Sequence, residues 1–157
     1  MNDNFSLYLD FAEKISQIVL VIVATTAAVI AFRQVRTSST LELFKILQDE
    51  KIVRARSHVI RNLESKPLSQ WDEVDYGAAQ DVSGAYNIVG VLLKSNFASR
   101  SMFIERYCSS IQRTYRHLQA YRADIYHKTN QDPYYWEGYE WLYSQACRLH
   151  DLYPDDS

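Results

Sequence analysis

The chain has 157 residues, 17 basic and 19 acidic side chains, and a formal net charge of -2. This length suits a single domain, and the acidic stretch over residues 129–157 argues against a nucleic-acid partner. The two cysteines, Cys108 and Cys147, are far apart and form no CxxC pair. They are typical of reduced thiols in a cytoplasmic setting.

Residues 15–32 form a run of eighteen residues without a charge. Ten of them are Ile, Val, Leu or Phe, and four are Ala. As a helix the run would be about 27 Å long, just short of the ~30 Å hydrocarbon core of a bilayer. It predicts a transmembrane helix that follows a short extracytoplasmic N-terminus, residues 1–14. A cleaved signal peptide is the main alternative, although the segment before the run is acidic rather than basic.

The basic residues Arg33 and Arg36 directly follow the run, so the positive-inside rule places the rest of the chain in the cytoplasm. We expect a basic juxtamembrane linker over residues 33–38, a helical domain over residues 39–150 and an acidic tail over residues 151–157. Three small residues within the run share one helical face and predict a surface on which two spans pair. They are Ala24, Ala28 and Ala31.

The cytoplasmic domain reads as all-α, because glycine and proline are scarce and the apolar residues recur with helical spacing. We expect about four helices, over residues 39–63 with a possible break at 48–50, then 73–93, 101–128 and 133–150. Asp132 as N-cap and Pro133 at the first helical position would start the last helix. Gly84 and Gly90 fall inside the second helix and predict that another helix packs closely there.

The last predicted helix holds the densest aromatic set in the chain, and packing is the first explanation for it. Its tyrosine hydroxyls would then need partners, which we expect from the Arg and His residues of the third helix. The third helix is basic and the fourth is acidic. We therefore expect Arg113, Arg116 or Arg122 to face Glu137 or Glu140.

The sequence contains no recognised catalytic, phosphate-binding or metal-binding motif. His117, Asp124 and His127 could share one helical face, and they are the only polar cluster that suggests a metal site. Asp124 and His127 give one carboxylate-x-x-His pair, whereas a di-iron bundle needs two such pairs and further glutamates. We therefore predict no catalytic residue, cofactor or metal.

Three segments carry a resemblance to a known family. They are Phe44-Lys45-Ile46-Leu47 with Val53-Arg54-Ala55-Arg56, then Tyr86-Asn87-Ile88-Val89-Gly90-Val91-Leu92-Leu93, then Tyr134-Tyr135-Trp136-Glu137-Gly138-Tyr139-Glu140-Trp141-Leu142. Over about residues 40–147 the chain resembles a family of short bacterial membrane-anchored proteins known only as a domain of unknown function. The resemblance implies a single-pass protein of the bacterial inner membrane. It implies no reaction.

Three functional hypotheses follow. The first is a non-enzymatic, membrane-tethered interaction or regulatory module that self-associates or binds a protein partner. The second is a bundle metalloprotein or hydrolase that uses His117, Asp124 and His127. The third is a pore-forming effector whose assembled spans expose Thr25 and Thr26 to the pore.

Overall fold

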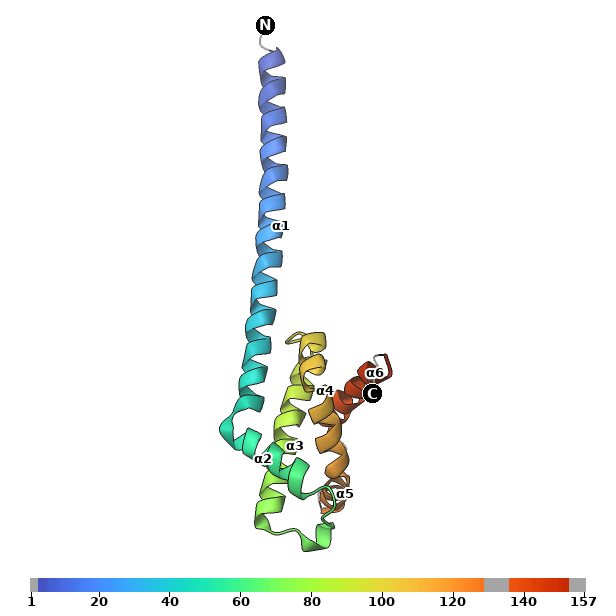
Figure 1. The fold of residues 1–157 in the computed structure, drawn as a ribbon. Helices are drawn as coiled ribbons and strands as arrows, with labels where there is room; N and C mark the ends of the chain where they lie inside the picture. The colour runs from blue at the N-terminus through green and yellow to red at the C-terminus, as the bar shows by residue number, and fades with distance from the viewer. Residues whose placement is uncertain (1–2, 129–135, 153–157) are drawn as a thin grey trace. The chain divides into compact units, whose positions relative to one another are not determined.

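The computed structural model describes residues 3–128 and 136–152, and within these residues the fold is all-α (Figure 1). The chain divides into two compact units, Met1–Ser38 and Ser39–Ser157. The α-helices and one 3-10 helix, η1, follow the chain in this order: α1 (Asp3–Gln48), α2 (Glu50–Asn62), η1 (Leu68–Gln70), α3 (Glu73–Lys94), α4 (Arg100–His117), α5 (Gln119–Lys128) and α6 (Glu137–Leu152).

Helix α1 begins in the first unit and ends in the second. The residues of the predicted basic linker, 33–38, are helical and continue α1 without interruption. The start predicted near Ser39 is therefore wrong: Ser39 and Thr40 are buried on the helix rather than capping a new one. The break predicted at residues 48–50 is present, since Asp49 ends α1 and accepts a hydrogen bond from the Lys51 amide as the N-cap of α2.

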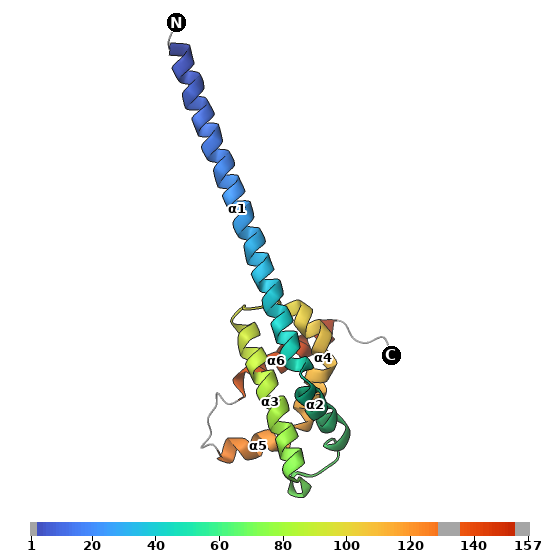
Figure 2. The ribbon, with the colours of Figure 1, turned by 90° about the vertical axis from the view of Figure 1, so that its left-hand side faces the viewer.

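The bundle of the second unit is organised around α3, which packs against α2, α4 and α6 (Figure 2). Asp72 caps the start of α3 with a capping box, accepting from the amides of Val74 and Asp75. At 22 residues α3 is about 33 Å long. The α3–α4 connection lies at one end of the bundle, and η1 and α5 lie at the other (Figure 1).

The predicted third helix is divided in the structure. It forms α4 and α5, and Leu118 lies between them as the C-cap of α4. Leu118 is fully buried, so the bend occurs in the core rather than at the surface. The predicted start of the last helix, Asp132 and Pro133, lies outside the described residues, as does the acidic tail from residue 153; the described helix α6 begins at Glu137.

The core of the bundle combines aliphatic side chains with stacked aromatic rings. Its largest fully buried side chains are Tyr86, Tyr139, Phe103, Leu43, Leu47, Leu93, Ile111, Leu118, Leu142, Val59, Val82 and Val89. Tyr86 and Tyr139 stack at 5.0 Å between ring centroids, and their hydroxyls hydrogen-bond to Ser110 and Thr114. For the Tyr139 hydroxyl, which belongs to the last predicted helix, the arginine or histidine partner expected from the third helix is therefore wrong, since the partner is Thr114. Burial raises the pKa of both tyrosines, so they remain neutral hydrogen-bonding groups.

Candidate functional site

The uncharged run of α1 is exposed along its whole length. Every residue from Lys14 to Val35 is exposed, and the large apolar residues among them range from 45% exposed at Ile15 to 71% at Leu20. Among the described residues, α1 is the one helix long and apolar enough to cross a membrane. A contiguous exposed apolar surface of this kind indicates a segment that a membrane or a binding partner covers.

The predicted pairing face and its polar neighbours all lie on this exposed helix. Ala24, Ala28 and Ala31 are exposed and present small side chains outward. Thr25 and Thr26 each donate a hydrogen bond of 2.8 Å to a carbonyl one turn earlier, at Val21 and Ile22. Both hydroxyls are thus satisfied within the helix, and neither requires a water-filled pore.

The basic residues after the run continue the same helix. The guanidinium of Arg36 lies 5.9 Å from the centre of the Phe32 ring, so the last aromatic residue of the run and the second arginine contact one another. Arg33 remains exposed one turn earlier. This arrangement joins the apolar run to its basic flank with no intervening loop.

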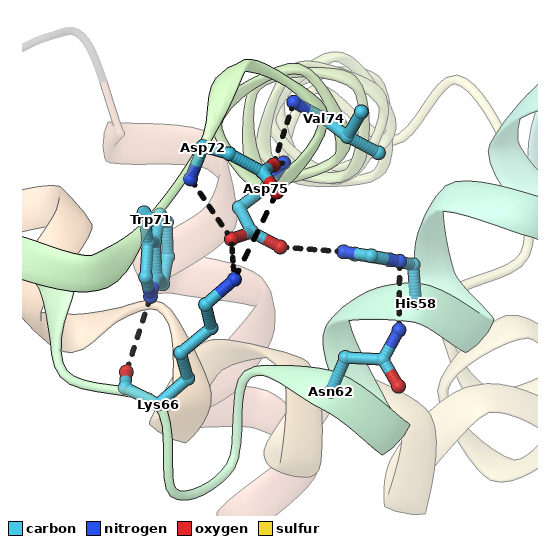
Figure 3. Close-up of polar contacts among 7 residues, drawn as sticks. All are labelled: His58, Asn62, Lys66, Trp71, Asp72, Val74 and Asp75. Carbon is cyan, nitrogen blue, oxygen red and sulfur yellow. Dashed lines mark hydrogen bonds and ion pairs between the residues drawn. The ribbon is translucent and has the colours of Figure 1, made fainter.

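The bundle contains a buried polar cluster that joins α2, the following connection and α3 (Figure 3). At its centre is the Asp75 carboxylate, which is 1% exposed. One oxygen lies 2.7 Å from His58 Nε2, and the other accepts hydrogen bonds from the Lys66 ammonium and, at 3.0 Å, from the Asp72 amide. Burial alone would raise the Asp75 pKa, but the hydrogen bonds from Lys66, His58 and the Asp72 amide lower it to about 2.

The same cluster holds the connection between α2 and α3 in place. Asn62 Nδ2 lies 2.9 Å from His58 Nδ1, and Trp71 Nε1 donates 3.1 Å to the Lys66 carbonyl (Figure 3). Both ring nitrogens of His58 therefore lie within hydrogen-bond distance of protein groups. The arrangement is that of a structural clamp around a buried carboxylate.

Sequence reasoning missed this cluster because its members come from three separate elements. One part of it does have a sequence signal. Asp72 followed three residues later by Asp75, just before an apolar helical run, follows the pattern of a capping box. Nothing in the spacing of His58 and Lys66 indicates that both meet that second aspartate.

The structure does not bring His117, Asp124 and His127 together as a site. Asp124 pairs with Lys128 at 2.6 Å, and the His127 ring packs edge-on against Tyr126. His117, on α4, has a buried Nε2 with no hydrogen-bond partner in the described part of the chain, and burial lowers its pKa. Within residues 3–128 and 136–152, no group of three or more His, Cys, Asp and Glu side chains could hold a metal ion.

The backbones of α3 and α6 approach closely where Gly90 faces Gly138. A Cβ added to Gly90 would lie 1.9 Å from the Gly138 carbonyl oxygen, so the packing predicted at Gly90 is present. Beside it, Asn87 Oδ1 accepts from the amides of Gly138 at 2.9 Å and Tyr139 at 3.2 Å, and thereby caps the first turn of α6. The close packing predicted at Gly84 is wrong, because nothing lies within 4 Å of a Cβ there.

Charge pairing around α6 agrees in part with the sequence expectation. Arg122 on α5 forms an ion pair with Glu140, which is one of the predicted pairs. Glu137 instead pairs with Lys94 at the end of α3. The acidic start of α6 therefore contacts two different basic elements, because α6 lies against both α3 and the α4–α5 region.

Two of the three segments that carried the family resemblance meet at this helix pair. The segment from Tyr86 to Leu93 supplies Tyr86, Asn87 and Gly90, and the described part of the last segment supplies Gly138 and Tyr139. Their residues are the ones that a close α3–α6 contact requires. The resemblance therefore rests on the packing of the bundle.

These features define an all-α protein with one apolar helix of membrane-spanning length and a bundle closed by the glycine contact between α3 and α6. The chain belongs to the family described as "Domain of unknown function (DUF4760)", which it matches over residues 14–146. The match includes the apolar run as well as the bundle. No curated protein and no solved structure matches the chain.

Proposed function

We propose that the protein is a non-enzymatic module that α1 tethers to the inner membrane of a bacterium, where it self-associates or binds a protein partner. The observation that carries this proposal is the complete exposure of the uncharged run, residues 15–32. Ten exposed aliphatic or aromatic side chains on one helix are unfavourable in water and favourable in hydrocarbon by about 0.3–0.6 kcal/mol each. Arg33 and Arg36 favour a cytoplasmic bundle and an N-terminus on the outside.

Self-association would use the face of Ala24, Ala28 and Ala31. Lipid tails are as apolar as the helices, so the hydrophobic effect does not drive two spans together in a bilayer. Close backbone contact through small residues drives their association instead. The bundle would then be held in the plane of the membrane, where confinement raises the effective concentration of each copy for the others. A weak contact between two copies would therefore be enough for them to associate in the membrane.

No specific observation favours the two alternatives. A bundle metalloprotein or hydrolase needs His117, Asp124 and His127 to converge, whereas two of the three are engaged by other neighbours. A pore lined by Thr25 and Thr26 needs hydroxyl groups that seek water, whereas both are bonded within their own helix.

The experiment compares two small-to-large substitutions in the full chain, Ala28→Leu on the proposed face and Thr26→Leu on the opposite side of the helix. Chemical crosslinking in native membranes gives the fraction of dimer for each. Ala28→Leu should lower that fraction several-fold, while Thr26→Leu should leave it near the wild-type value. Equal crosslinking in all three proteins would contradict pairing through this face.

A further inference from the structure

Within the second unit, a groove of about 500 Å³ lies between the last turns of α1 and the first turns of α4. Phe44 is fixed on the α1 side, because its ring stacks on the buried Phe103 at 5.5 Å and lies 5.9 Å from Tyr107, measured between ring centroids. Met102, on the α4 side, is 50% exposed. The other lining residues are polar and exposed: Gln48, Glu105 and Arg106. A rigid aromatic surface therefore lies next to a flexible apolar side chain and two charges.

The two charges in this groove are of opposite sign and adjacent. Glu105 and Arg106 are consecutive, exposed residues of α4. Neither forms an ion pair or a side-chain hydrogen bond with any residue in the described part of the chain. By contrast, the exposed Glu42 and Lys45, which flank Phe44 on α1, pair with each other at 2.7 Å. Among the described residues, the groove thus offers one unmatched negative charge and one unmatched positive charge.

This charge pattern is complementary to itself. A partner with charge of one sign would attract one of the two residues and repel the other. A second copy of the chain, related by a two-fold axis, satisfies both, because each contact between the copies then occurs twice with the roles exchanged. Arg106 of each copy would face Glu105 of the other. The unbranched side chain of Met102 is suited to the apolar part of such a contact, since methionine adapts to irregular surfaces.

We propose that this groove is the surface through which the bundles of two copies associate, with Arg106 of each copy paired to Glu105 of the other and Met102 of each covered by its neighbour. A standard stable interface uses roughly 20–30 residues on each side, whereas five line this groove. The contact is therefore weak between copies in solution, and it forms between copies that a membrane holds at high effective concentration. The inference thus rests on the membrane tethering proposed above, and it adds the partner and the contact surface of the bundle.

The test reverses these charges in the full chain and measures contact between copies in native membranes. In a Cys108→Ser, Cys147→Ser background, a short bismaleimide crosslinks Ser109→Cys, an exposed position one turn after Glu105. Two coexpressed copies carry tags of different size, so that mixed and like pairs separate on a gel. Arg106→Glu gives a copy two adjacent acidic residues, and Glu105→Arg gives a copy two adjacent basic residues.

We expect Arg106→Glu alone and Glu105→Arg alone each to lower crosslinking several-fold, since like charges then face one another. Coexpression of the two variants should restore it, in mixed pairs only. This restoration also shows that both variants are folded. The matched control is Arg113→Glu, an exposed charge two turns further along α4, which should leave crosslinking at its original level.

Three results would overturn the contact through this groove: no crosslinking at position 109, equal crosslinking with and without the charge reversals, or no restoration in the mixed pairs. An amine-reactive crosslinker and sedimentation of the same membranes test the proposed function separately. If the amine-reactive reagent still captures dimers, self-association stands and only the groove contact is wrong. If the chain does not sediment with the membranes, the tethering and the groove contact are both wrong.

Discussion

Two stretches of the same helix, α1, have opposite environments. From Lys14 to Val35 every side chain is exposed, whereas in the last three turns Thr40, Leu43 and Leu47 are almost completely buried in the bundle. Both stretches are helical and rich in apolar residues, so secondary structure does not distinguish them. They differ in periodicity: residues 18–23 of the first stretch are aliphatic all round, and the second has one apolar stripe among Glu42, Lys45 and Gln48.

The two stretches of α1 depend on different surroundings for their stability. The second is stabilised by side chains of the same chain, so its integrity depends on packing, on close backbone contacts and on satisfied polar groups. None of the described side chains covers the first, and under the proposed membrane anchoring its stability would come from lipid. Changes to the two stretches, or to the bundle that covers the second, should therefore be detected by different measurements.

The largest effect is expected from charges placed in the exposed run. Each arginine near the centre of a membrane helix costs about 2.5–3.5 kcal/mol, so Val21→Arg with Val23→Arg would offset the insertion energy of the whole run. The double variant should be lost from the membrane fraction while its bundle stays folded by circular dichroism. The control is Val74→Arg with Val91→Arg, two exposed valines of α3. If the control variant is lost from the membrane fraction to the same extent, the loss is not caused by charges in the uncharged run.

The next largest effect is expected at the glycine contact. Gly90→Ala would place a methyl group 1.9 Å from a backbone oxygen of α6. Overpacking of this kind typically costs about 1–3 kcal/mol, and a rigid backbone neighbour favours the upper end of that range. Thermal unfolding of the full chain in detergent, followed by circular dichroism, should show a marked loss of stability.

Gly84→Ala is the matched control, because it makes the same change in the same helix where space is open. It should raise stability by up to about 1 kcal/mol, since alanine favours a helix interior. Equal destabilisation at both positions would show that α3 tolerates no side chain at either glycine and would remove the special role of the α3–α6 contact.

The buried carboxylate should give a smaller and pH-dependent effect. Asp75→Asn removes the charge that Lys66 and His58 contact, and we expect a loss of about 1–3 kcal/mol at neutral pH. The pKa of Asp75 is about 2 in the folded protein against an ordinary 3.8. A lowered folded-state pKa means that its stabilisation is complete above about pH 4 and is lost as the pH falls toward 2.

The variant should consequently lose less stability than the wild type when thermal unfolding is compared across that acidic range. Parallel curves for the two proteins would show that Asp75 is not the group whose protonation weakens the bundle there. Glu73→Gln, an exposed carboxylate two residues away, provides the control and should follow the wild-type curve.

The smallest effect is expected for the ion pair between α5 and α6. Arg122 and Glu140 are each a little over one-third exposed, and pairs of this kind are worth about 0.2–1 kcal/mol. Arg122→Glu should lower the unfolding temperature slightly, and the double swap with Glu140→Arg should restore it. Failure of the double swap to restore stability would mean that Arg122 acts through packing rather than through charge.

The sequence was sufficient to predict the features that local pattern determines. The all-α class, the apolar run, the break at Asp49 and the start of α3 after Asp72 each depend on periodicity or on a capping residue within a few positions. The close contact at Gly90 could be predicted because an interior glycine in a helix is unfavourable without a packing reason.

The features that sequence reasoning missed depend on contacts between distant segments. Gly84 carries the same local signal as Gly90, and only the position of α6 distinguishes them. The buried Asp75 is satisfied by Lys66 and His58, which belong to different elements, and α4 ends at Leu118, whose side chain is buried in the core. Each of these features depends on how helices pack against one another, and the residue pattern within a single helix does not predict that packing.

On the account proposed above, residues 15–32 are embedded in lipid. The most direct test is alkaline carbonate extraction of membranes from bacteria that express the full chain, because this treatment removes peripheral proteins and leaves spanning ones. The wild-type protein should remain entirely in the membrane pellet, while the Val21→Arg, Val23→Arg variant should move to the supernatant. Release of the wild-type chain into the supernatant would contradict the claim.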